Sequence, residues 1–156
     1  MTLAVSDGWI EGPLKQFVSE ARVQLAVVLH ASGQALGQYG FSRSVEVMSA
    51  CALSAAIHAS SGELGRMLDG SPFRGLHYVG QDRQVFLGQL ATGERPLLLL
   101  AVFGDESSLG LVQLYLREFS VNLAAAMPAE PDEPPALGDD FERELNHNLA
   151  VLFGRA

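Results

Sequence analysis

The sequence contains few cysteine and histidine residues, which are common in metal sites and catalytic sites. It contains one cysteine, Cys51, and four histidines that lie far apart: His30, His58, His77 and His147. The motifs HExxH and GxSxG, paired-cysteine zinc spacing, and the phosphate loops GxxxxGK[ST] and GxGxxG are all absent. We therefore expect no enzymatic activity, no metal and no cofactor. A single cysteine also excludes a disulfide within the chain.

Positive charge and long apolar runs are also scarce. Lysine and arginine number 10 against 18 acidic residues, and the formal net charge is -8, so a polyanion would be repelled. The longest apolar run, residues 96–103, is far too short to cross a bilayer, and the first residues lack the basic start of a signal peptide. These features predict a cytoplasmic protein that binds no nucleic acid and does not insert into a membrane.

The longest helical pattern, residues 44–68, carries no charged side chain between Glu46 and Glu63, and its residues sort into two opposed faces. At about 100° per residue, one stripe is aliphatic and is expected to pack on the sheet of the same chain; it consists of Leu53, Ile57, Leu64 and Leu68. The opposite stripe has small or uncharged residues where a solvated helix would carry charges, so we predict that it meets a second protein. This second stripe consists of Met48, Ala52, Ala55, Ala59, Gly62 and Arg66. The central helix of a three-layer monomer is the alternative.

The other patterns predict an α+β domain in the order α-β-β-α-β-β-β-α. Apart from the long helix, they indicate helices over 10–22 and 105–127 and strands over 23–31, 35–40, 75–81, 84–92 and 95–104. We expect a five-stranded antiparallel sheet with the long helix on one face and the two others on the opposite face. An edge strand containing His77 and Tyr78 is predicted to pair with its copy across a two-fold axis.

The chain divides into three predicted parts. Residues 1–126 form the domain, and residues 127–138, with four prolines and three acidic residues, form an extended linker. Residues 139–156 form a C-terminal amphipathic helix that would be marginal alone, so it is expected to dock on its own domain or on a partner. The apolar side chains of that helix are Phe141, Leu145 and Leu149.

These elements resemble the Roadblock/dynein light chain domain. The likeness lies in the hairpin VQLAVVLHASGQALGQYG, the small-residue helix ending in ELGRMLDG, and the segment LLLLAVFGDESSLG. In that last segment a buried strand runs through an acidic turn into a helix. The likeness covers residues 10–126 and rests on the pattern of elements, because the family has no catalytic signature.

The resemblance implies a homodimer, or a higher assembly, that regulates a small Ras-like GTPase. Roadblock domains pair with their long helices side by side and their central strands joined, and they serve as platforms for such GTPases. The resemblance further implies a GTPase activator that rearranges the GTPase's own catalytic residues. The small-residue stripe would then lie at the GTPase contact, with the C-terminal helix as a second contact that affects nucleotide exchange.

Three other interpretations remain open. The dimer could instead supply an arginine finger, for which the candidates are Arg43, Arg66 and Arg74. It could be a scaffold in a GTPase-linked complex that does not accelerate hydrolysis. It could also be a ligand-binding sensory domain of the profilin or PAS type, since these share the architecture.

Overall fold

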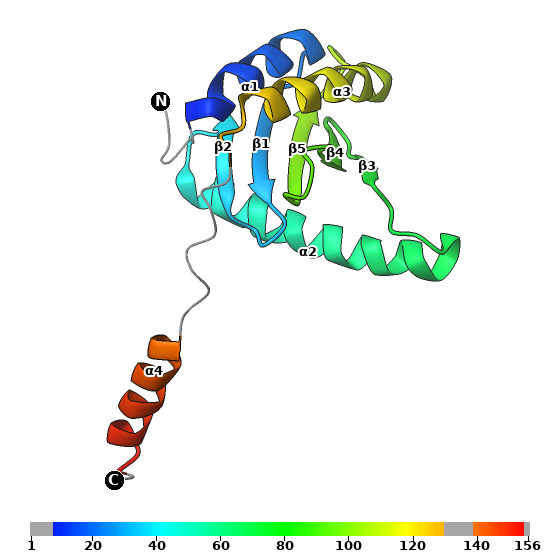
Figure 1. Ribbon diagram of the computed structural model, residues 1–156. Helices are drawn as coiled ribbons and strands as arrows, with labels where there is room; N and C mark the ends of the chain where they lie inside the picture. Colours follow the sequence, from blue (N-terminus) through cyan, green and yellow to red (C-terminus); the bar gives the residue numbers. More distant parts are fainter. Residues whose placement is uncertain (1–7, 130–138, 155–156) are drawn as a thin grey trace.

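The computed structural model describes residues 8–129 and 139–154, and it places the side chains of these residues except those of 139–142. Figure 1 shows the arrangement of the helices and strands. In chain order they are α1 (Gly8–Ala21), β1 (Leu25–His30), β2 (Ala35–Tyr39), α2 (Ser44–Asp69), β3 (Gly75–Val79), β4 (Gln84–Gln89), β5 (Leu97–Phe103), α3 (Leu109–Ala126) and α4 (Asp139–Leu152). The α+β fold class and the order of elements predicted from the sequence are confirmed.

The five strands form one antiparallel sheet in the order β2-β1-β5-β4-β3. Strand β5 lies in the middle and pairs with β1 on one side and β4 on the other, so its run of leucines is buried. Strands β2 and β3 form the two edges. The strand that contains His77 and Tyr78 is β3, so it occupies the position that its predicted pairing with a second copy requires. That pairing itself stays a prediction.

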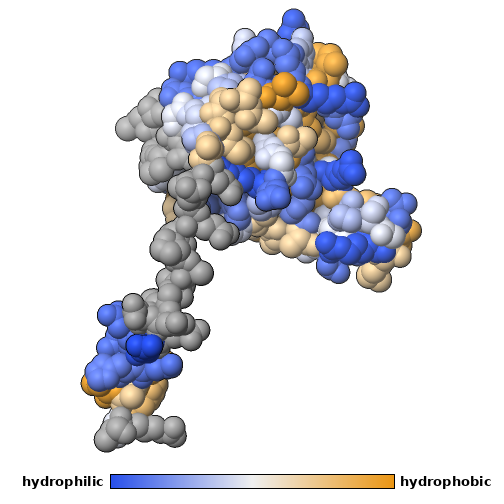
Figure 2. Space-filling view, in the orientation of Figure 1, coloured by the Kyte–Doolittle hydropathy of each residue, from blue (hydrophilic) through white to orange (hydrophobic). Residues whose placement is uncertain are grey.

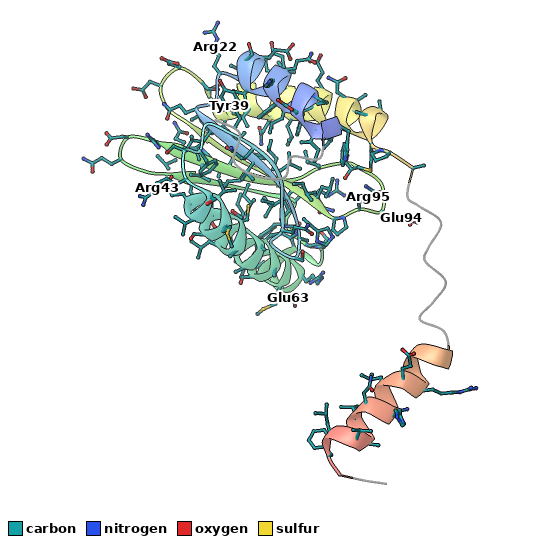
Figure 3. The ribbon with its side chains drawn as sticks, turned by 90° about the vertical axis from the view of Figure 1, so that its left-hand side faces the viewer. Arg22, Tyr39, Arg43, Glu63, Glu94 and Arg95 are labelled. Carbon is teal, nitrogen blue, oxygen red and sulfur yellow. The ribbon has the colours of Figure 1, made fainter. Side chains whose placement is uncertain are left out.

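The sheet separates two helical layers, with α1 and α3 on one face and α2 on the other (Figures 1 and 3). Side chains alternate along β1, so that Val28 enters the core under α1 and α3 while Leu29 enters the core above α2. Phe17 of α1 and Phe119 of α3 meet in the first core with ring centroids 5.2 Å apart. Both faces of the sheet centre are therefore filled by apolar side chains.

The side of α2 that packs on the sheet differs from the prediction. Leu53, Leu64 and Leu68, which were expected to face the sheet, are 65%, 49% and 71% exposed. Only Ile57 of that stripe packs against the core. The buried residues of α2 are instead Val47, Cys51, Ser54, Gly62 and Gly65.

The volume of the side chains on this face of the sheet explains the difference. The face of the sheet toward α2 carries large side chains, among them Leu29, Leu87 and Leu98, all of which are buried. A helix that lies closely against such a surface has room for small side chains only, because interiors are packed to near-crystalline density. The sequence prediction for this stripe was wrong because it weighed the hydrophobicity of the helix without the volume of the sheet.

Gly65 sets the position of the segment that leads into β3. After Gly70 caps α2 in the left-handed conformation, with φ 74°, the chain passes directly over Gly65. A Cβ atom at Gly65 would lie 2.5 Å from the backbone nitrogen of Phe73 and 2.7 Å from the carbonyl oxygen of Ser71. Both atoms belong to the backbone, so a side chain there would displace residues 71–73 and the start of the edge strand.

We therefore expect Gly65→Ala to lower the free energy of unfolding by about 1–2 kcal/mol, because overpacking exceeds the gain in helix propensity. Urea unfolding followed by circular dichroism measures this change. Gly110→Ala in α3 is the matched control, since a Cβ there meets nothing within 4 Å; it should be neutral or stabilising. Equal stabilisation by both substitutions would contradict the tight contact at Gly65.

Candidate protein-interaction surface

Large apolar side chains cover the outer side of α2. We call this surface the α2 face and define it by Val45, Met48, Leu53, Leu64, Met67 and Leu68, all of them exposed. Figure 2 shows orange, hydrophobic atoms among blue, hydrophilic ones on α2 at the lower edge of the domain. Burial of each such side chain would contribute roughly 1–2 kcal/mol. Several large apolar side chains gathered on one exposed helix of a folded protein indicate an interaction site.

The small-residue stripe predicted to face a partner is only partly on this outer side. Met48, Ala52, Ala59 and Arg66 are exposed, whereas Ala55 is half-buried and Gly62 is buried. A Cβ at Gly33, in the β1–β2 turn, would lie 3.7 Å from the Cβ of Ala55, and a Cβ at Gly62 would lie 3.8 Å from the Cβ of Pro72. At these two positions the small residue therefore accommodates the chain itself, and the prediction of an outward-facing Gly62 was wrong.

Two residues of the α2 face were missed by the sequence reasoning. Val45 and Met67 lie between the two stripes that the helical projection separated, and Met67 is 81% exposed. The sequence signal that could have identified them is that both are large apolar residues at positions between the two stripes. With them, exposed apolar side chains lie on the outer side of α2 also between the two stripes, where Glu63 is exposed as well.

The edge strand β3 extends the exposed apolar surface. Tyr78 is 47% exposed and Val79 is 74% exposed. Leu76 and Tyr78 are paired with Leu87 and Val85, which belong to the α2 side of the sheet, but α2 packs mainly against β1 and β2. Near β3, therefore, less of this sheet face is covered by α2. Strand β3 also has an unpaired edge.

His77 points to the opposite side of the sheet from Tyr78, as the alternation of a strand requires. Its Nε2 lies 2.7 Å from Oε1 of Gln84, and its ring stacks on Phe103 with centroids 6.1 Å apart. These contacts hold the exposed strand β3 to its neighbour β4 and to the central strand β5. The two predicted edge residues thus have different surroundings, and Tyr78 is the one on the same side of the sheet as α2.

The length of α2 exceeds the width of its own sheet. The helix has 26 residues, which corresponds to about 39 Å at a rise of about 1.5 Å per residue. Five strands at a spacing of about 4.8 Å span only about 20 Å. The helix runs across the strands, and Figure 1 shows its last turns extending past β3. Leu64, Met67 and Leu68 lie in this overhanging part.

Arg43, which precedes α2, and Arg66 within α2 take part in ion pairs on the surface. Arg43 Nη1 lies 3.9 Å from Oε1 of Glu46, and Arg66 pairs with Glu63 one turn away. Figure 3 shows Glu63 on the outer surface of α2. Exposed pairs of this kind contribute little to stability, about 0–1 kcal/mol, so both arginines can exchange partners at low cost.

The C-terminal helix α4 is amphipathic and presents its apolar side chains to solvent. Leu145, Leu149, Leu152 and Phe153 are exposed, and Figure 2 shows orange atoms at this helix. The side chain of Phe141 and the central part of the predicted linker, residues 130–138, lie outside the described residues. The division at residues 126 and 138 stays a prediction.

The described part of the chain offers no constellation for catalysis by a metal. Within residues 8–129 and 139–154 there is no group of three or more His, Cys, Asp or Glu side chains that could hold a metal ion. None of the helices described is long and apolar enough to cross a membrane. Cys51 is buried against the sheet, and desolvation raises the pKa of its thiol, so it remains protonated and unreactive at neutral pH.

Solved structures share the arrangement described above. MglB from Myxococcus xanthus matches with a TM-score of 0.66 at 22% identity, over 74% of this chain and 92% of that chain. The gliding protein MglB from Thermus thermophilus gives a TM-score of 0.66 at 19% identity, over 80% and 94% of the two chains. A Roadblock/LC7 domain from Streptomyces avermitilis gives 0.61 at 16% identity, over 78% and 97%. No family model and no curated protein sequence matches the chain.

The chain therefore has the Roadblock fold, and the resemblance seen in the sequence is confirmed at the level of the fold. Within that class it is similar in structure to MglB. Profilin IA from Acanthamoeba castellanii is more distant, with a TM-score of 0.51 at 14% identity over 75% of this chain and 97% of that chain. Since one architecture serves several functions, the function has to be argued from the surface of this chain.

Proposed function

We propose that the chain forms a homodimer through the α2 face and the β3 edge. The observation that carries this proposal is the overhang of α2, because its exposed leucines lie beyond the sheet that would otherwise cover them. If two copies pair at β3, the overhanging turns of each α2 reach beneath the sheet of the other copy. The two long helices then lie side by side, and the unpaired edge of β3 gains a neighbour.

The dimer in turn regulates a small Ras-like GTPase in the cytoplasm, by analogy with MglB. It has no catalytic residues of its own and accelerates GTP hydrolysis by rearranging those of the GTPase, which is MglA-like in this proposal. The analogy extends to a role in cell polarity or gliding motility. Likeness of fold supports the analogy, and the exposed apolar surface supplies a place for a partner to dock.

The two sides of α2 have different tasks in this proposal. Leu53, Leu64 and Leu68 meet the second copy, because large exposed aliphatic side chains gain most from burial. Ala52 and Ala59 lie on the other side, beside Arg66, where short side chains let the GTPase approach the helix backbone closely. The dimer contact is thereby assigned to the stripe that the sequence had assigned to the chain's own sheet.

Stimulated GTP turnover tests the proposal. The purified dimer is added to the small Ras-like GTPase whose gene lies nearest to that of this chain, and phosphate release is measured. Acceleration supports an activator, and binding without acceleration supports the scaffold alternative. If no small Ras-like GTPase binds, the proposed function is wrong. Substitution of Arg43, Arg66 and Arg74 by alanine, one at a time, tests the arginine finger, since loss of a finger would lower the rate with binding kept.

Removal of residues 128–156 should separate the two predicted contacts. Met127 packs against the core and is kept in this variant, so the remaining domain retains both of its apolar cores. We expect stimulated hydrolysis to persist at about its original rate, while any effect on nucleotide exchange is lost with α4. Phosphate release and the release of a fluorescent GDP analogue measure the two activities.

The substitution of Leu145 and Leu149 by serine in the full chain is the control for this truncation. It removes the apolar side of α4 without shortening the protein, and it should reproduce the loss of exchange. Loss of stimulated hydrolysis in the truncated protein, with the domain still folded, would show that α4 belongs to the main contact instead.

A further inference from the structure

The outer side of α3 carries two large apolar side chains that the domain itself does not cover. Leu114 and Val121 are both more than half exposed. They are seven residues apart, and at about 3.6 residues per turn this spacing places them on one line along the helix. The buried side of α3, with Val112, Phe119 and Leu123, faces the opposite direction. The line of Leu114 and Val121 therefore points away from the core.

One positive and one negative side chain flank this apolar line. Arg117 and Glu118 lie between Leu114 and Val121, about 60° to one side of the line and about 40° to the other. Both are exposed, and neither forms an ion pair with a residue that the structure describes. We call these four residues the α3 face.

Helix α1, which lies beside α3 in the same layer, has a different outer side (Figures 1 and 3). Its exposed side chains are polar, and several are paired within the helix. Lys15 Nζ lies 2.9 Å from Oε1 of Glu11, and Nε2 of Gln16 donates a hydrogen bond to Oε1 of Glu20 at 3.1 Å. The outer side of α1 is typical of a surface that faces water, whereas the apolar α3 face is typical of a protein contact.

We propose that the α3 face binds the α3 face of a second copy, with the two helices parallel about a two-fold axis. Leu114 and Val121 then each meet the same residue of the second copy. Arg117 faces Glu118 of the second copy on one side of this apolar line, and the reverse pair forms on the other side. Ion pairs that flank an apolar line in this way set the orientation and the choice of partner in coiled coils.

The flanking charges favour the parallel orientation over the antiparallel one. In an antiparallel pair, residues on one side of the apolar line face the same residues of the second helix. Arg117 would then face Arg117, and Glu118 would face Glu118. Like charges opposite each other destabilise a contact, so the antiparallel pair is disfavoured.

A second copy also fits the α3 face better than the C-terminal helix does. Helix α4 has exposed leucines seven residues apart, Leu145 and Leu152. The positions that correspond to Arg117 and Glu118 are, however, Asn148 and Leu149, which carry no charge. Helix α4 therefore offers no opposite charges at these positions, whereas α3 of a second copy offers both.

The α3 face and the surface proposed for the dimer lie on opposite sides of the sheet. One copy can therefore make both contacts at once, and pairing through α3 would link dimers into larger assemblies. Each copy contributes only two large apolar side chains, and contacts that bury little surface are weak, so we expect a dissociation constant above about 100 μM. The inference goes beyond the proposed dimer and does not depend on it.

Sedimentation velocity of the full-length protein, from about 10 μM to about 1 mM at low salt, tests the contact. We expect the average mass to rise above that of the dimer in the upper part of this range. Added salt should weaken the rise, because it screens exposed ion pairs. Val121→Asp should weaken the association at least about tenfold, since it places a charge in the apolar line. Circular dichroism confirms that this exposed substitution leaves the fold intact.

Exchange of the two charges separates a direct contact from a structural effect. Arg117→Glu or Glu118→Arg alone sets like charges opposite each other and should weaken the association at least about tenfold. The double variant Arg117→Glu, Glu118→Arg restores both opposite-charge pairs and should associate like the original chain. Lys15→Glu is the control, because it makes the same change of charge on α1 in the same layer. It should associate like the original chain.

Several results would overturn the proposal. These are the absence of association at about 1 mM, undiminished association of both single charge variants, and failure of the double variant to recover. Loss of association in the variant with Leu145 and Leu149 replaced by serine, with the α3 variants unaffected, would assign the contact to α4 instead. A monomer at about 10 μM would contradict the proposed dimer alone, because pairing through α3 would still appear as a monomer–dimer equilibrium with the same response to the charge variants.

Discussion

Ala59→Arg is expected to leave a folded dimer that no longer binds or stimulates its GTPase. Ala59 is exposed on α2, and arginine has a high helix propensity, so the fold should not suffer. The long charged side chain would, however, stand between the helix and any protein that approaches its backbone. Enclosing that charge without a partner, or displacing the GTPase to avoid it, costs about 3 kcal/mol or more, which corresponds to a loss of affinity of about 100-fold.

The measurement combines phosphate release with light scattering on the same sample. Gln113→Arg is the control, because it adds the same charge at an exposed position of α3 on the opposite side of the sheet. Normal stimulation by Ala59→Arg would show that the GTPase docks elsewhere. If this variant is a monomer, the small-residue side of α2 belongs to the dimer contact, and the tasks of the two sides are exchanged.

The periodicity of the sequence was sufficient to predict the elements of the fold. Strand β5 is a short run of leucines flanked by turn residues, and α3 has Val112, Phe119 and Leu123 at helical spacing with their side chains in the core. Both faces of β5 are apolar and both are buried, and one apolar side of α3 faces the core, so in these two elements the pattern and the burial coincide. The order of the elements along the chain, with β3 directly after the long helix, was enough to predict that β3 lies at an edge of the sheet.

The orientation of α2 could not be predicted by the same means, because this helix has apolar residues on more than one side. Hydrophobicity favoured Leu53 and Leu64 as the buried stripe, yet the sheet accepts Cys51, Ser54 and Gly65 instead. The deciding factors were the volume of the leucines on the sheet and the passage of residues 71–73 over the helix. Both are tertiary contacts that no local pattern contains.

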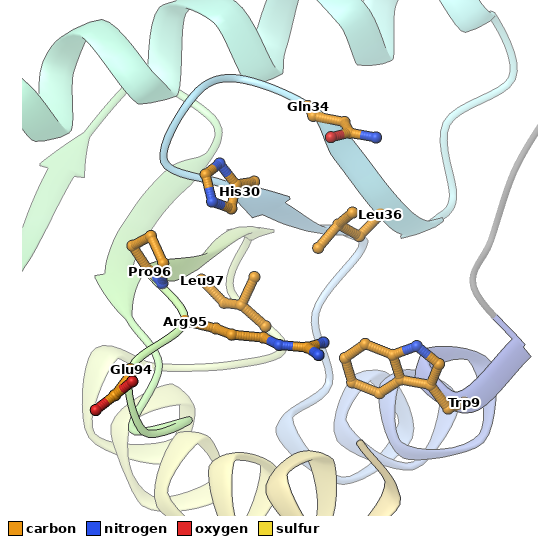
Figure 4. A pocket seen from close by; sticks show the side chains of 8 residues that line it. All are labelled: Trp9, His30, Gln34, Leu36, Glu94, Arg95, Pro96 and Leu97. Atoms are coloured by element: carbon orange, nitrogen blue, oxygen red, sulfur yellow. The ribbon is translucent and has the colours of Figure 1, made fainter. Parts of the chain in front are cut away.

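The grouping of side chains around the end of β1 and the start of β5 could not be predicted from the sequence for a related reason. Trp9, His30, Gln34 and Arg95 share no motif and no periodic spacing, yet they line one hollow (Figure 4). The antiparallel pairing of β1 with β5, which sets His30 opposite Leu97, brings two of these chain segments together.

Leu53→Asp should convert the dimer into a folded monomer. Leu53 is 65% exposed in the isolated chain, so its replacement removes little of the core and should change the free energy of unfolding by only about 1 kcal/mol. In a two-fold dimer the same substitution occurs twice in one interface. At about 2 kcal/mol for each buried leucine, the loss is about 4 kcal/mol, which raises the dissociation constant about 1,000-fold.

Leu114→Asp provides a closely matched control. Leu114 is 60% exposed on α3, and the same substitution there adds the same charge on the opposite side of the sheet. Light scattering or sedimentation at micromolar concentration should find a monomer for Leu53→Asp and a dimer for Leu114→Asp. Because Leu53 is one of the exposed leucines of α2 assigned to the dimer contact, persistence of the Leu53→Asp dimer would show that this assignment is wrong, whereas dissociation of both variants would show that the added charge acts without regard to position.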